Sequence, residues 1–166
     1  MSNFVSQESD IVEQAIDETS TTQKHPLGKN IRALDVAATD YGSGEFVYLK
    51  GLASTAVGEC VMYSEDGHAT KLAVANDAGS IAFAMSACVT GEFGWYQVKG
   101  KAVGLALASF GDNAACYLTA TAGSIDDEVV AGDRLHGCIS ASAVDTPSTG
   151  LAELEINYPR TDNVAD

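Results

Sequence analysis

The chain has 166 residues, of which 46% are hydrophobic and 7% aromatic, and its formal net charge at pH 7 is −14. This length accommodates one domain with a core of its own. Binding to naked nucleic acid and adsorption to anionic membranes are disfavoured, because both need clustered Lys and Arg, and here 9 such residues oppose 23 acidic ones.

The first thirty residues are polar and lack an apolar run. We interpret residues 1–30 as an N-terminal arm without a secretory signal, since no Lys or Arg precedes Lys24. Residues 9–16 have the pattern of a short helix that Asp10 would cap, but so short a helix is unstable alone in water. The arm is expected to order against another surface. Its apolar residues are the candidate anchors: Phe4, Val5, Ile11, Val12, Ile16 and Leu27.

Residues 31–159 form short alternating runs rich in Ala, Val and Gly, which predict β-strands. The last run is the clearest, because it places Ala152, Leu154, Ile156 and Tyr158 on one face. Strands are expected near residues 33–36, 45–52, 60–64, 70–75, 81–88, 94–107, 115–120, 127–130, 136–142 and 151–158.

Glycines indicate where these strands turn or bend. Asp66-Gly67 between two runs predicts a hairpin with a type I′ turn. Gly100 and Gly104 interrupt the longest run and predict a bulge or a sharp bend. We therefore expect an all-β body at residues 31–159, followed by a short C-terminal tail at residues 160–166.

Four cysteines lie inside apolar runs, and none forms a CxxC pair. This pattern favours buried, reduced thiols, with two disulfides as the alternative; the spacing does not suit zinc. The four are Cys60, Cys88, Cys116 and Cys138.

No constellation of residues predicts catalysis, a cofactor or a metal site. The three histidines, His25, His68 and His136, are isolated in the sequence. The acidic run at residues 126–128, close to Asp133, lacks the spacing of a calcium loop and is interpreted as a solvated turn. We therefore expect a protein that is not an enzyme.

Trp95 and Tyr96 are adjacent bulky aromatics on one expected strand, so they should face opposite sides. One would lie in the core. The other would be exposed, where it could stack on a sugar or fill a subunit interface. The alternative is that both anchor the core.

The body resembles the capsid decoration (cement, or head-stabilising) proteins of tailed bacteriophages. The resemblance extends over residues 47–158. It consists in a recurring pattern in which a glycine in a turn is followed by a short strand of small residues. The runs that carry it are residues 56–63, 82–86, 97–102 and 132–137.

The resemblance implies a β-barrel or a β-tulip- or sandwich-like body that binds the outside of an icosahedral head. The implied partner is the major capsid protein, and the implied assembly is a homo-oligomer, with a trimer favoured. The implied location is the outer capsid surface of the virion, after synthesis in the host cytoplasm. An acidic protein suits this place, since it need not touch the packaged DNA.

Two other functions remain open. One is a carbohydrate-binding or host-attachment module that would use Trp95 or Tyr96. The other is a small trimeric β enzyme of the dUTPase type, although the sequence does not contain its Gly-rich C-terminal loop.

Overall fold

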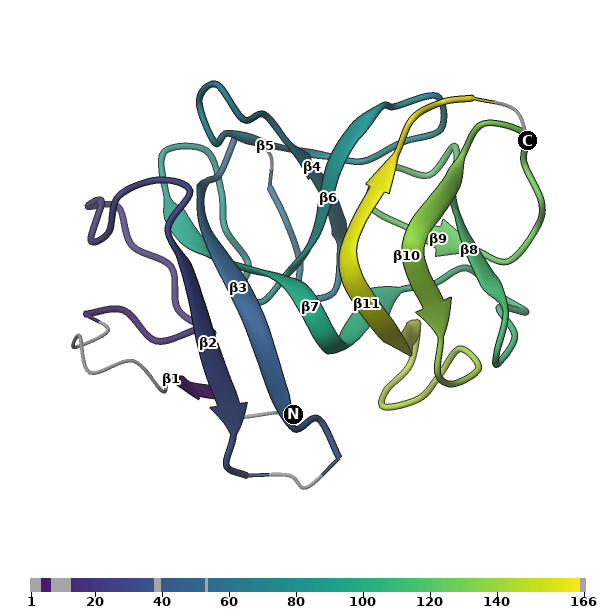
Figure 1. The fold of residues 1–166 in the computed structure, drawn as a ribbon, viewed down its shortest axis with the longest axis horizontal. Helices are drawn as coiled ribbons and strands as arrows, with labels where there is room; N and C mark the ends of the chain where they lie inside the picture. The colour runs from purple at the N-terminus through teal and green to yellow at the C-terminus, as the bar shows by residue number, and fades with distance from the viewer. Residues whose placement is uncertain (1–3, 7–12, 38–39, 53, 165–166) are drawn as a thin grey trace.

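The computed structural model describes residues 4–6, 13–37, 40–52 and 54–164, and over these residues it contains β-strands and no helix (Figure 1). The predicted all-β fold is confirmed. In the same residues no helix is long and apolar enough to span a membrane. The strands are β1 (Phe4–Ser6), β2 (Asn30–Asp35), β3 (Ser43–Lys50), β4 (Cys60–Tyr63), β5 (Thr70–Leu72), β6 (Gly79–Ala84), β7 (Phe93–Leu105), β8 (Ala115–Leu118), β9 (Ile125–Asp126), β10 (Arg134–Ser140) and β11 (Leu151–Thr161).

These strands form one antiparallel sheet in the order β1-β2-β3-β7-β6-β11-β10-β8-β9, with β4 pairing β6 and β5. The sheet is not closed into a barrel, so the barrel form of the prediction is not the one adopted. β7 joins the two halves of the molecule. Its first half pairs with β3, and its second half pairs with β11 from Lys99 opposite Asn157 to Leu105 opposite Leu151.

The change of partner along β7 occurs at Gly100, where the sequence predicted a bend. Gly100 has φ of +102°, and a Cβ atom there would lie 2.6 Å from the backbone oxygen of Ser43. A side chain would therefore prevent the close approach of β3 to the bend. Gly104 allows a second close approach, because its Cβ would lie 2.5 Å from Leu154 Cδ1.

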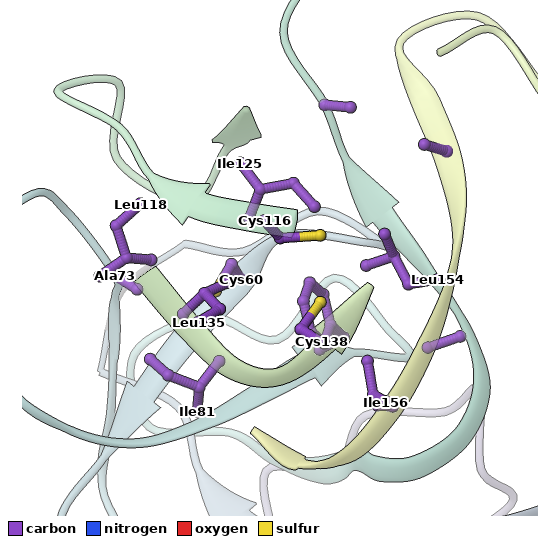
Figure 2. Close-up of a cluster of buried hydrophobic side chains, with 14 of the residues drawn as sticks. Cys60, Ala73, Ile81, Cys116, Leu118, Ile125, Leu135, Cys138, Leu154 and Ile156 are labelled. Carbon is purple, nitrogen blue, oxygen red and sulfur yellow. The ribbon is translucent and has the colours of Figure 1, made fainter. Parts of the chain in front are cut away.

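The buried apolar residues of the described chain form three clusters, and one of them, which includes Cys88 and Tyr96, is built mainly from residues of β3, β4, β6 and β7. The C-terminal cluster lies between β4, β6, β8, β10 and β11 and includes Cys60, Cys116 and Cys138 (Figure 2). The N-terminal cluster includes Ile16, Tyr48 and Trp95. All four cysteines are free and buried, as the sequence predicted.

Three local predictions differ from the structure. Residues 127–130 are a loop after β9, and Val129 there is 76% exposed. The β4–β5 hairpin exists, but its positive φ of 50° is at His68, so the loop is longer than a two-residue type I′ turn. Tyr158 was expected on the buried face of the last strand but is exposed. Its φ of +47° interrupts the in–out alternation of β11, opposite a register shift between His136 and Cys138 on β10.

Candidate interaction surface

Residues 13–29, which we name the strap, are drawn in purple in Figure 1. They contact the adjoining ends of β3 and β7, at Tyr48 and Phe93. The amide of Ser20 donates to Phe93 O (3.0 Å), and the Phe93 amide donates back to Ser20 O (2.8 Å). Further along, the Gly28 amide donates to Tyr48 O (2.9 Å). Much of the predicted arm is thus bound to its own body.

Gln14 fixes the start of the strap and is 2% exposed. Its Nε2 donates to Glu18 O (2.7 Å) and Phe93 O (2.9 Å), while Tyr48 Oη donates to Gln14 Oε1 (2.7 Å). Trp95 Nε1 donates to Gln14 O (3.1 Å). Residues 13–16 are not helical, so the described part of the predicted helix is wrong; residues 9–12 lie outside the described residues. The hydrogen bonds of the buried Gln14 side chain, and not a helix, hold this segment against the body.

The strap accounts for two of the six candidate anchors. Ile16 is 3% exposed and packs in the N-terminal cluster of its own chain, so in this conformation its side chain does not lie at the surface where a capsid anchor was expected. Leu27 is half-buried against the same cluster. Ile11 and Val12 lie outside the described residues. Phe4 belongs to β1, but its side chain is likewise outside the description.

Of the candidate anchors whose side chains the structure describes, Val5 is the exposed one. It pairs with Leu34 across β1 and β2, so the two side chains share a face; they are 49% and 38% exposed. Val36, one residue beyond β2, is 61% exposed. We name Val5, Leu34 and Val36 the edge patch, since β1 is the end of the sheet order.

Sequence reasoning missed Leu34 and Val36, although a signal was present. The buried residues of β2 are Ile31, Ala33 and Asp35, so Leu34 occupies the outward phase. Apolar residues in the polar phase of a strand mark a candidate interaction surface where several of them lie together.

A ladder of charged side chains borders the edge patch. On β3, Glu45 Oε1 pairs with Arg32 of β2 (3.2 Å) and with Lys99 of β7 (3.3 Å). Tyr158 Oη also donates to Glu45, and this bond is the largest cause that lowers the pKa of the Glu45 carboxyl. Beyond the bend of β7, Lys101 pairs with Glu153 of β11 (2.8 Å). The result is an apolar patch with a polar, charge-paired rim, which is the usual anatomy of a protein interface.

Neither predicted aromatic is exposed. Trp95 is 0% exposed and Tyr96 1% exposed, so the expectation that one of them lies at the surface is wrong and the alternative, that both anchor the core, holds. Both rings are covered because β7 is central in the sheet, with the strap over Trp95 on one side and β4 and β6 near Tyr96 on the other. They cannot serve as a stacking platform in this conformation.

The acidic and histidine residues do not converge on one site. Asp127 Oδ2 accepts from the Gly111 amide (3.0 Å), so it caps a loop. His136 Nε2 lies 3.9 Å from Asp162 Oδ2, whereas His25 is part of the strap and is buried against Tyr48 and Trp95. Over the described part of the chain, no group of three His, Cys, Asp or Glu residues could hold a metal ion.

A depression of about 390 Å³ lies over β10 and β11 at their register shift. Arg134, His136, Ile139, Glu155 and Asn157 are among the residues that line it.

Comparison of the chain with protein-family models, with curated proteins and with solved structures finds no match in any of the three.

Proposed function

We propose that the protein is a structural, non-enzymatic virion component that decorates the outside of an icosahedral phage head. It bridges and stabilises neighbouring copies of the major capsid protein. The observation that carries this proposal is the edge patch of Val5, Leu34 and Val36 beside the charged ladder. The resemblance of residues 47–158 to phage decoration proteins supports the same function.

The edge patch provides both apolar area and backbone groups for a partner. Each of its side chains contributes on the order of 1 kcal/mol when a partner covers its exposed part, before ordering costs are subtracted. Because β1 is an edge strand, its outer backbone groups can also pair with an extended segment of the capsid protein. Contact is therefore expected along β1 and β2.

Charge and multiplicity complete the proposal. A net charge of −14 suits docking on a basic area of the outer capsid. The same charge disfavours non-specific self-association through electrostatic repulsion. A patch of three side chains binds weakly by itself. A homotrimer that engages several capsid subunits at once converts weak contacts into strong overall binding.

We do not propose the carbohydrate-binding alternative. It relied on Trp95 or Tyr96 as an exposed platform, and both rings are buried.

Cosedimentation tests the proposal. The purified protein is mixed with expanded heads of the phage that encodes it, prepared from a strain that lacks this gene. We expect saturable binding to expanded heads and less binding to unexpanded procapsids. Absence of binding to expanded heads contradicts the proposal.

A further inference from the structure

His25 is the one histidine of the strap, and the strap holds it inside the protein. Its side chain is 7% exposed. The ring centroid lies 5.1 Å from that of Tyr48, edge to face, and 5.1 Å from that of Trp95, tilted by 47°. Its Nε2 is buried and has no hydrogen-bond partner among the described residues.

The surroundings of His25 disfavour its charged form. Burial is the largest cause that lowers its pKa; Lys29 lowers the pKa further, and Glu13 opposes both. A proton on Nε2 would add a buried charged donor without an acceptor, which is costly in an apolar site. The Trp95 ring offers a cation some compensation, but the net direction remains downward.

Among the described residues, the charged groups that act on His25 are Lys29 and Glu13, and both belong to the strap. β3 presents Tyr48, whose pKa is raised by burial, so its hydroxyl is neutral near pH 7. β7 presents Trp95 and the ring of Phe93. On the other side of the strap, the His68 ring from the β4–β5 loop lies against Gly28, where a Cβ would be 2.3 Å from His68 Nε2.

We propose that the strap is a pH-sensitive latch: it lies closed over Trp95 and Tyr48 while His25 is neutral, and it detaches from β3 and β7 when His25 takes up a proton. The proposal is independent of capsid binding. The closed strap binds fewer protons at His25 than the open strap. Its stability is therefore complete above the ordinary histidine pKa of about 6.5 and declines as pH falls below that value.

Amide hydrogen exchange of the full chain, resolved by residue at pH 7.5 and pH 5.0 and corrected for intrinsic rates, tests the latch. The amides of Ser20 and Gly28 are bonded to β7 and β3, and we expect their protection to fall about tenfold or more at pH 5.0. The Leu105 amide, bonded to Gly58 O, should keep its protection. Unchanged protection at Ser20 and Gly28, or an equal loss at Leu105, overturns the proposal.

Two variants identify the titrating group. His25→Phe keeps an aromatic ring in the site and should abolish the pH step, whereas His68→Gln should retain it. Emission of Trp95, the one tryptophan of the sequence, should match wild type at pH 7.5 if the strap of a variant is closed. If His25→Phe does not close, His25→Gln replaces it as a second neutral variant. The assignment to His25 is overturned if a variant with a neutral residue at position 25 and a closed strap still loses amide protection at pH 5.0. It is also overturned if His68→Gln no longer shows that loss.

Discussion

Tyr48 Oη donates a hydrogen bond of 2.7 Å to Gln14 Oε1, across 34 positions of sequence. Through this bond and its neighbours, a polar segment becomes part of the N-terminal cluster, because both polar atoms of the buried Gln14 side chain have partners. The segment that sequence alone assigns to a partner's surface is therefore largely bound within the chain.

Gln14→Ala tests this role. The change removes the acceptor of the buried Tyr48 hydroxyl and two bonds to strap and β7 carbonyls, so we expect the free energy of unfolding to fall by about 2–3 kcal/mol. Urea unfolding followed by Trp95 fluorescence measures it. Gln23→Ala is the matched control, since Gln23 is exposed and makes one bond to His25 O (2.9 Å); its loss should stay below about 1 kcal/mol. Equal losses for both variants would refute the role of Gln14.

Two truncations separate β1 from the strap. Deleting residues 1–12 should leave the strap closed and Trp95 emission unchanged, because Gln14, Ile16 and His25 remain. Deleting residues 1–27 removes these buried side chains and uncovers Trp95, so the emission should shift to longer wavelength and the thermal midpoint should fall. Equal midpoints for the two truncations would show that the strap does not stabilise the body.

Gly100→Ala tests the bend of β7. The residue has φ of +102°, and a Cβ would lie 2.6 Å from Ser43 O, so the backbone must shift. We expect destabilisation of about 2 kcal/mol or more in urea unfolding. Gly67→Ala is the control, since nothing lies within 4 Å of its Cβ position. A similar small effect at both positions would mean that the bend does not need glycine.

The four thiols should be unreactive in the native protein. Burial raises the pKa of Cys60 and of Cys88, and a hydrogen bond with Cys116, followed by burial, raises that of Cys138. Because the thiolate is the reactive form, Ellman's reagent at pH 8 should label none of the four until the protein is unfolded in denaturant. Rapid labelling of the native protein, or an intact mass four hydrogens below that of the reduced chain, would contradict this.

The strands could be predicted from sequence because period-two alternation and turn glycines are local signals. Residues 151–156 follow the alternation, but Tyr158 departs from it, since the register shift at Gly137 is a property of two strands together. Residues 127–130 were predicted as a strand but form a loop. The Asp127 carboxylate accepts a hydrogen bond from the Gly111 amide, a contact between loops that the local pattern does not predict.

The site was harder to predict because its determinants are distant in sequence. Nothing local indicates that Gln14 would be buried, since its partners Tyr48 and Phe93 lie 34 and 79 positions away. Val5 was a candidate from its apolarity alone. Its partner Leu34 could be identified only from the alternation of β2. Every second residue from Ile31 is buried there, so Leu34 faces outward.

Capsid binding by the edge patch is the central claim, and cosedimentation with expanded heads tests it most directly. Leu34→Asp puts a charge into the proposed interface, next to Val5 and away from the buried face of β2, so the protein should fold normally. Val129→Asp, at a residue 76% exposed in the β9–β10 loop, is the matched control. We predict that Leu34→Asp weakens binding at least about tenfold and that Val129→Asp binds as wild type does. Wild-type binding by a folded Leu34→Asp protein would contradict the account.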